Sequence, residues 1–388
     1  MNKRDAVIVQ VARTPVGKMR QSLASVEAID LGAAVVKAVI TRSGIDPKEI
    51  DDIIFGNLFN YENGNIARMI GLNADLPFSV PGVTVDRQCS SSLNAVAFGM
   101  LAIQTGNADI IVAGGVESYS RQHFLLDRPQ AAYPGALKFA AYAASIEKVG
   151  NPTMIQTAEN LAKMYSISRR ECDEFACASH QKAAAAWSAE RFKDQVVPYT
   201  VPGKKGDTVV TMDDCVRSDI SLNALAKLAP IYEGGVVTAG NSSPMNDGAS
   251  AVLLMSREKA AALGLPVLAK VTSYAAAGCD PKIMGIGPVE ATRRLMKKTG
   301  LGLKDFDLIE LNEAFAAQSL ACIKELGLDQ ARINVNGGAI AIGHPNAASG
   351  GILVGRIVHE MIRRDVKRGL VSFCIGGGQG LSALIERD

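Results

Sequence analysis

Short apolar runs alternate along the whole chain with longer stretches that are apolar on one side only. Apolar runs of about five residues bounded by Gly or polar residues indicate buried strands, and apolar positions three and four apart indicate helices. Their alternation predicts an α/β fold. In the first half, the pattern predicts strands at 6–11, 50–55, 82–87 and 109–113, and helices at 30–41 and 90–105.

The second half repeats this order. "DIIVAGGVES" and "GLVSFCIGGGQG" occupy the same place in the two series, each as a strand that ends in glycines. One unit used twice predicts two β/α layers packed back to back around central helices, with a site where turns of both halves converge. The predicted strands are 267–274, 306–311, 332–335, 370–374 and 381–386, and the predicted helices 288–299, 314–325 and 349–363.

A central segment interrupts this rhythm with mixed polar stretches, a helical pattern at 157–192 and a Pro/Gly-rich stretch. Long insertions in a compact domain usually carry function, so we expect this segment to cover the site. The expected division is an N-terminal half at 1–118 completed by about 241–265, a loop domain at 119–240, and a C-terminal half at 266–388.

Composition narrows the class of protein. The chain has 388 residues, 48% of them hydrophobic, and a net charge of +2, so a large core is expected and nucleic-acid binding is not. Seven irregularly spaced Cys without a CxxC, and four His without ligand spacing, predict neither a disulfide framework nor a metal site. We find no targeting pattern and no apolar stretch of membrane-spanning length, so we expect a cytoplasmic protein with no membrane partner.

Cys89 lies in "VTVDRQCSSSLNAV", where a predicted strand meets an apolar helix. A helix N-terminus offers unpaired N–H donors and a partial positive charge, which favour the reactive thiolate. The Ser residues that follow allow a tight polar turn. On this motif alone, a nucleophile and a buried structural Cys are equally good interpretations.

Two further motifs lie in the second half. His344, in "NGGAIAIGHPNAASGGILV", occupies a Gly-bracketed turn before a small-residue helix, where a neutral imidazole acts as a base or oxyanion donor. Cys374, in "VSFCIGGGQG", ends a strand, and the glycines from Gly376 onward leave backbone N–H groups open to an anion. An ordinary loop His and a tight β-turn are the structural alternatives. A nucleotide-binding loop is a weak alternative, since no Lys follows.

Asn312, in "IELNEAFAAQ", stands at a strand end before an apolar helix. It is either a helix N-cap or a ligand for a catalytic water. Together, these motifs supply two thiols, an imidazole and Gly-rich donors at corresponding turns. That set suits Claisen chemistry on a thioester, which needs a nucleophile, an acid or base for the α-carbon, and two oxyanion sites.

The chain resembles the thiolase family from end to end. This resemblance implies a layered αβαβα core of duplicated β/α halves with an inserted loop domain, and the activity of an acetyl-CoA C-acyltransferase or acetyl-CoA C-acetyltransferase. The motifs that carry it stand in family order: "VARTPVGK", "RQCSSSL", "AGGVES", "TAGNSSPMNDGAS", "NEAFA", "GHPNAASG" and "CIGGGQG".

The resemblance also implies roles for single residues. Cys89 resembles the acylated nucleophile, which His344 activates. His344 and a water held by Asn312 would form the first oxyanion hole. Cys374 is similar to the family's acid/base thiol, and the backbone N–H groups of Cys89 and Gly376 would form the second oxyanion hole.

Coenzyme A enters as a substrate, with acyl-CoA and acetyl-CoA, and no permanently bound cofactor is implied. Ser243 matches a pantetheine contact, and Arg217 matches a residue near the adenine. The family also implies a homodimer or homotetramer. Three apolar residues match pocket-lining positions, with core packing as the alternative: Met154, Met284 and Phe315.

Three departures from the family pattern bear on substrate choice: Ser92 and Ile155 stand where Gly is usual, and Asn346-Ala347 replaces an apolar–Gly pair. The expected reaction is thiolytic cleavage of a 3-ketoacyl-CoA, with biosynthetic condensation of two acetyl-CoA as the alternative. A decarboxylating ketoacyl synthase lacks a second catalytic Cys, so Cys374 argues against it. A non-catalytic acyl-CoA- or lipid-binding relative would have lost at least one reactive group.

Overall fold

A computed structural model describes residues 2–59, 63–128, 136, 138–140 and 142–388. Within them, ten strands form one mixed sheet in the order β10-β11-β12-β9-β1-β8-β5-β3-β4, with β2 paired to β8. The separate strands β6 (Tyr199–Val201) and β7 (Thr208–Val210) pair with each other. The sheet strands are β1 Ala6–Arg13, β2 Gly17–Lys18, β3 Asp52–Gly56, β4 Gly82–Val85, β5 Ile110–Ser118, β8 Asn246–Ser256, β9 Ala269–Gly278, β10 Leu308–Leu311, β11 Arg368–Ile375 and β12 Gln379–Glu386.

The two ends of the sheet have the same construction. In the N-terminal half β5 runs parallel to β3 and antiparallel to β8, and in the C-terminal half β11 runs parallel to β10 and antiparallel to β12. Among the described residues, β1 and β9 connect the two ends of the sheet through the pairs Val7–Lys270 and Ile8–Ala269. The strand pairing therefore confirms the repeat that the two glycine-ended strands predict.

The predicted strand at 332–335 is wrong. Ile333 makes only an isolated parallel bridge to Ile309, at the place where β4 pairs with β3 in the other half. Asn334 has a φ of 44°, which turns the backbone away. Its side-chain amide bonds both the N–H and the C=O of Leu311, at 2.9 and 2.8 Å, and so replaces the backbone ladder.

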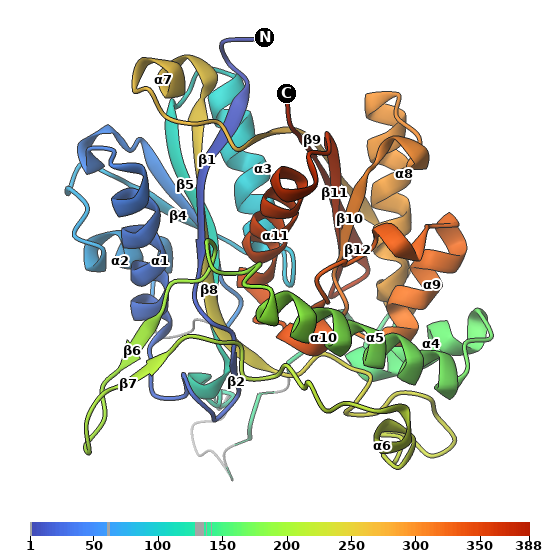
Figure 1. Cartoon of the computed structure of the whole chain (residues 1–388). Helices are drawn as coiled ribbons and strands as arrows, with labels where there is room; N and C mark the ends of the chain where they lie inside the picture. The colour runs from blue at the N-terminus through green and yellow to red at the C-terminus, as the bar shows by residue number, and fades with distance from the viewer. Residues whose placement is uncertain (1, 60–62, 129–135, 137, 141) are drawn as a thin grey trace.

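Helices cover both outer faces and fill the space between the halves (Figure 1). Two helices, α3 (Ser91–Gln104) and α11 (Ser349–Arg364), lie in the middle. The layers therefore follow the order αβαβα. The outer helices are α1 (Ala28–Ser43) and α2 (Ile66–Asn73) on one side, and α8 (Gly287–Thr299) and α9 (Ala316–Leu326) on the other.

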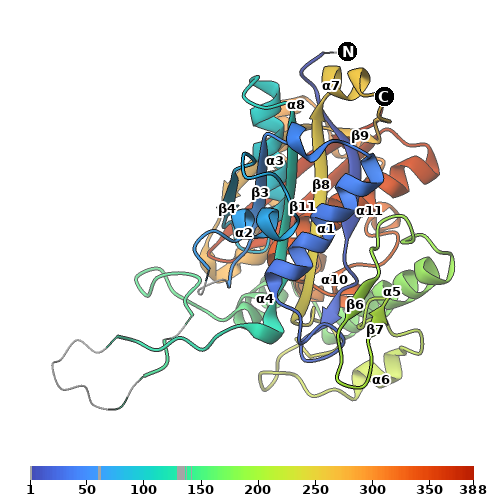
Figure 2. The same cartoon turned by 90° about the vertical axis from the view of Figure 1, so that its left-hand side faces the viewer.

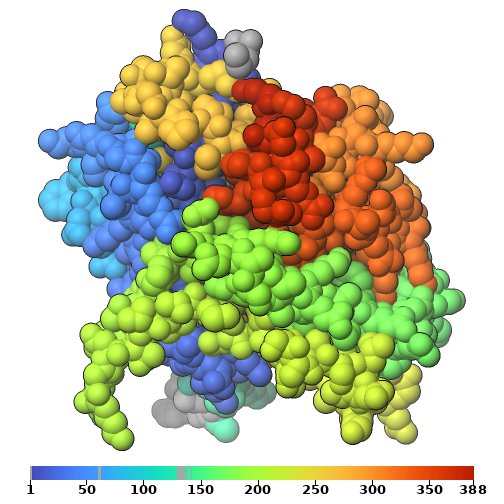
Figure 3. Space-filling view, in the orientation of Figure 1, coloured from blue at the N-terminus to red at the C-terminus, as the bar shows by residue number. Residues whose placement is uncertain are grey.

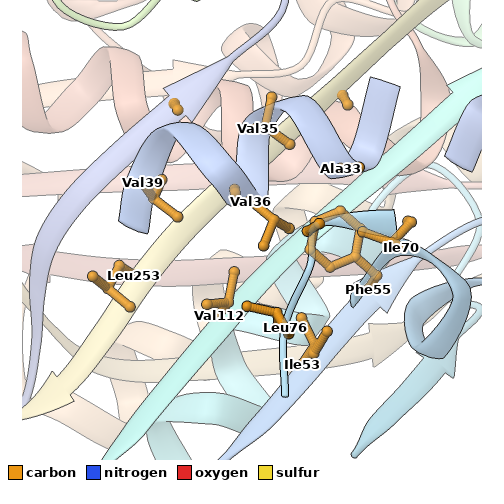
Figure 4. Packing of buried hydrophobic residues seen from close by; sticks show 14 of the residues in the cluster. Ala33, Val35, Val36, Val39, Ile53, Phe55, Ile70, Leu76, Val112 and Leu253 are labelled. Carbon is orange, nitrogen blue, oxygen red and sulfur yellow. The ribbon is translucent and has the colours of Figure 1, made fainter. Parts of the chain in front are cut away.

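On the outer face of the N-terminal half, the apolar side of α1 packs against the sheet and forms a core. α1 lies across the sheet (Figure 2), and it ends at Gly44, whose φ of 71° permits a left-handed cap. Its inward face brings Val36 and Val39 onto Phe55 of β3 and Leu253 of β8 (Figure 4).

The segment between the two halves contains two helices where the sequence predicts one. The predicted helix at 157–192 is two helices, because the chain turns at Ser166 with a φ of 50° and Ser168 starts the second with a capping box. Their surface crosses both halves (Figure 3). The other α-helices of the described residues are α4 (Met154–Met164), α5 (Arg169–Ser188), α6 (Leu222–Ala226), α7 (Arg257–Ala262) and α10 (Ala339–Ile342).

We propose the domain boundaries 1–118 with 241–265, 119–240, and 266–388, of which 1, 60–62, 129–135, 137 and 141 lie outside the described residues. The pairing of β8 with both β1 and β5 supports the assignment of 241–265 to the N-terminal half. None of the helices in the described ranges has the length and apolarity that crossing a membrane requires.

Candidate active site

Cys89 lies in a tight turn between β4 and α3. The preceding residue, Gln88, has a φ of 46°, which is uncommon for a residue with a side chain. The hydroxyl of Ser91 holds the turn, because it accepts the Arg87 N–H at 2.8 Å and donates to the Gln88 carbonyl at 2.6 Å. The turn thus places the sulfur just before the N-terminus of α3, as the sequence predicts.

Three polar groups surround the Cys89 sulfur. The backbone N–H groups of Gly376 and of Cys89 itself favour its thiolate form, and its S–H group donates to Asn346 Oδ1 at 3.8 Å. Burial nevertheless raises the pKa of the Cys89 thiol to about 11. The helix N-terminus alone predicts stabilised thiolate, so here the loss of solvation outweighs the N–H donors. The thiol must therefore give its proton to a base before it can attack.

His344 is fixed on three sides. Its backbone N–H donates to Asn246 Oδ1 at 2.8 Å, its Nδ1 lies 2.6 Å from Ser349 Oγ, and its Nε2 lies 3.4 Å from Asn312 Nδ2. The preceding Gly343, with a φ of 114°, makes the turn into the site. Burial lowers the pKa of His344 to about 4, so the imidazole is neutral near pH 7 and able to accept a proton.

Asn312 follows β10, and its backbone N–H donates to the Ser372 carbonyl of β11 at 2.9 Å. The N-cap interpretation is wrong, because α9 begins only at Ala316 and its N-cap is Phe315. The Asn312 Oδ1 atom is buried and has no hydrogen-bond partner among the described residues. A buried acceptor of this kind suits a bound water, since an unsatisfied polar atom is costly.

Cys374 approaches the site from the other half of the chain. It lies on β11 opposite Gly380 of β12 and is buried. Burial raises the pKa of the Cys374 thiol well above its ordinary value, and the nearby Cys89 raises it further. The turn after β11 passes through Gly377 and Gly378, with φ of 81° and 82°, and the preceding Gly376 directs its N–H at the first thiol. The two sulfurs therefore share one site.

Most of the expected substrate-side residues lie near this pair. An apolar cluster holds Cys374 together with Met154, Met284 and Phe315. Ser243 adjoins it, since its N–H and hydroxyl donate to the Ala314 carbonyl at 3.0 and 3.1 Å.

Arg217 is the exception among them. It is exposed, and its backbone N–H donates to His180 Nδ1 at 3.2 Å. The structure therefore does not bring Arg217 to the two thiols.

Sequence reasoning missed several supporting residues. Ser349 and Asn246 hold His344, and both belong to motifs that the sequence singles out. Glu117, at the end of "AGGVES", is buried and accepts hydrogen bonds from the Asn57 amide and the backbone N–H groups of residues 58, 59 and 347. Only their position inside those motifs distinguishes these residues in the sequence.

Comparison with known proteins assigns both halves of the chain to one family. Residues 6–258 match the thiolase N-terminal domain and residues 265–387 match the thiolase C-terminal domain. The chain is 48% identical over 394 residues to an acetyl-CoA acetyltransferase of Pseudomonas aeruginosa, covering 99% of this chain and 100% of that protein. It is 44% identical over 398 residues to a beta-ketoadipyl-CoA thiolase of Pseudomonas knackmussii, covering 99% of each.

Two solved structures have the same fold. The Bacillus anthracis acetyl-CoA acetyltransferase superposes with a TM-score of 0.94 at 39% identity, covering 98% of each chain. Human mitochondrial 3-ketoacyl-CoA thiolase gives a TM-score of 0.94 at 37% identity, covering 100% of each chain. The fold, the matched domains and these relatives together establish that the chain belongs to the thiolase family.

Proposed function

We propose that this protein cleaves 3-ketoacyl-CoA with coenzyme A, and runs the reverse Claisen condensation, through an acyl group on Cys89. The observation that carries the proposal is the convergence of two thiols from opposite halves of the chain, where the Gly376 N–H favours the thiolate of Cys89. A neutral His344 in the adjoining turn supports the assignment of a base.

In the cleaving direction, His344 Nε2 accepts the Cys89 proton and the thiolate attacks the 3-keto carbon. The N–H groups of Cys89 and Gly376 stabilise the oxyanion, and each such donor contributes about 3 kcal/mol. The C2–C3 bond then breaks. Its electron pair forms the enolate of acetyl-CoA, whose thioester oxygen His344 and the water on Asn312 would bind.

The Cys374 thiol protonates this enolate at the α-carbon, and acetyl-CoA leaves. The raised pKa of Cys374 supports a role as the acid, because the thiol is protonated in the resting state. The Cys374 thiolate next accepts the proton of incoming CoA. The CoA thiolate attacks acyl-Cys89, releasing the shortened acyl-CoA, and Cys89 leaves as a thiolate that recovers its proton from His344.

Condensation of two acetyl-CoA is the second candidate, because it is the same reaction run backwards with the shortest acyl group. The name of the Pseudomonas aeruginosa relative favours it. We propose CoA contacts at Ser243 and Arg217, an acyl pocket at Met154, Met284 and Phe315, a homodimer or homotetramer, and a cytoplasmic location. The adjacency of these apolar residues to Cys374 supports the pocket.

The test is thiolysis of acetoacetyl-CoA against longer 3-ketoacyl-CoA substrates, together with labelling of the protein by radioactive acetyl-CoA. Cys89→Ala should lose both the label and the thiolysis activity. Cys374→Ala should lose thiolysis by about a thousandfold. Cys177→Ala, on α5, is the matched control and should retain both. Acyl transfer that persists in Cys89→Ala would contradict the proposal.

A further inference from the structure

Asn346, one of the departures from the family pattern, lies between the nucleophile and a phenol. Its Oδ1 accepts the Cys89 S–H at 3.8 Å, and its Nδ2 donates to the hydroxyl of Tyr119 at 2.6 Å. It stands two residues after His344, in the short turn Asn346–Ala348. An apolar residue at this position would make neither bond.

The surroundings hold the Tyr119 end of this bridge in place. The ring packs against Phe59, with ring centroids 5.2 Å apart. Burial raises the pKa of Tyr119 above its ordinary value, so the hydroxyl keeps its proton throughout the neutral range. A phenol hydroxyl both donates and accepts hydrogen bonds. The Tyr119 hydroxyl can therefore accept a hydrogen bond from Asn346 Nδ2–H or donate one to Asn346 Oδ1.

Ionisation of Cys89 changes the hydrogen bond that its sulfur can make. A thiol donates weakly to Oδ1, whereas a thiolate only accepts. Rotation of the Asn346 amide by half a turn directs Nδ2–H at the sulfur, and the Tyr119 hydroxyl then donates to Oδ1. Both arrangements keep two hydrogen bonds. The bond to the thiolate is the stronger one, because its acceptor is charged.

We propose that Asn346 and Tyr119 are a positioning pair that stabilises the Cys89 thiolate during acylation through a reversible side-chain amide. This inference rests on the proposed role of Cys89 as nucleophile. It adds a donor to those of the Cys89 and Gly376 N–H groups. The pair makes Cys89 easier to deprotonate in this chain than an apolar residue at position 346 would.

The charged and titratable groups near the sulfur make such a donor useful. Asp86, before the nucleophile turn, and Glu117, at the end of β5, both disfavour the thiolate. Cys374 of β11 and Tyr119 itself become harder to ionise when Cys89 is charged. The backbone N–H groups of Gly376 and Cys89 act against these charges, and a further hydrogen-bond donor at the sulfur adds to their effect.

The experiment measures the rate at which iodoacetamide alkylates Cys89 between pH 7.5 and 10, in the full-length protein without CoA. Mass spectrometry of the peptide that carries Cys89 separates this thiol from the others. The whole range lies below the Cys89 pKa of about 11, so a rise of about one unit in that pKa in Asn346→Leu should slow alkylation about tenfold at each pH. Tyr119→Phe, which keeps the ring on Phe59, should shift the pKa in the same direction by less.

Asn73→Leu is the matched control, because it makes the same change at an exposed, hydrogen-bonded Asn on α2. It should alkylate like the parent protein. An unchanged or faster rate of Cys89 alkylation in Asn346→Leu overturns the inference, and so does an equal slowing in the control. If Asn346→Leu does not fold, Tyr119→Phe gives the decision. Alkylation of Cys89 does not require the enzyme to turn over, so it tests this inference alone. A failure of the proposed function would be seen in a different experiment, as thiolysis activity that persists in Cys89→Ala.

Discussion

Gly350, at the start of α11, lies directly against Leu93 on α3. A methyl group added to Gly350 would lie 2.2 Å from the backbone nitrogen of Leu93, closer than any side chain permits. α3 follows Cys89 and α11 follows His344. The close approach of these two central helices therefore fixes the relative position of the nucleophile and the imidazole.

Gly350→Ala should lower the free energy of unfolding by about 3 kcal/mol and reduce activity, because the helices must separate. Gly355→Ala is the control on the same helix. Its added methyl would meet Val11 at 3.5 Å, an ordinary contact, so the change should be neutral or stabilise by up to about 1 kcal/mol. Urea unfolding measures both. Equal losses in the two variants would contradict the role of the contact.

Ser349→Ala should slow acylation of Cys89 about tenfold, because His344 Nδ1 loses the hydroxyl at 2.6 Å that orients its ring. Ser349→Thr keeps a hydroxyl and should retain most of the rate. Rapid-quench labelling with acetyl-CoA measures the step. If the Ala variant acylates at the parent rate, the ring is held by its other partners alone.

Glu117 should make stability depend on pH. Burial raises its pKa from 4.5 to about 8, so the folded protein binds an extra proton between these values. The free energy of unfolding should therefore fall as pH rises from about 5 to 8, by at most about 1.4 kcal/mol per pH unit. Glu117→Gln cannot ionise, so its stability relative to the parent should improve over this range. Urea unfolding at several pH values gives the two curves, and parallel curves would refute the prediction.

Asp213→Asn should cost about 3 kcal/mol or more, because it leaves the buried Arg13 guanidinium without its carboxylate. The pair is bidentate, at 2.7 and 3.0 Å, and joins β1 to the segment between the halves. Glu258→Gln breaks the exposed pair with Lys3 and should cost less than about 1 kcal/mol. Denaturant titration compares them. A small loss in Asp213→Asn would show that the guanidinium finds other acceptors.

Periodicity predicted most of the sheet and the central helices, because burial on one face leaves a local record in the order of residues. It failed where that record is missing. β8 is buried along its whole length, but its first half, "NDGAS", consists of polar and small residues, and its strand was not predicted. The failed strand at 332–335 has apolar residues, but the Asn334 side chain takes over the pairing that its backbone would make.

The reactive residues were predicted by motif. The sequence identified Cys89, His344, Cys374 and Asn312 as candidates, but their proximity depends on packing between the two halves. The N-cap alternative for Asn312 failed for a related reason, because the sequence pattern did not show that α9 begins only at Ala316.

The sequence by itself determined the α/β class, the duplicated order of elements and the chemistry on offer, because these follow from residue types and their near neighbours. Only the tertiary structure decided which groups meet and what burial does to them. Cys89 and Asn346 are 257 positions apart, and their contact exists only because α3 and α11 pack together. The raised pKa of the Cys89 thiol is likewise a tertiary effect, because its main cause is burial in the folded chain.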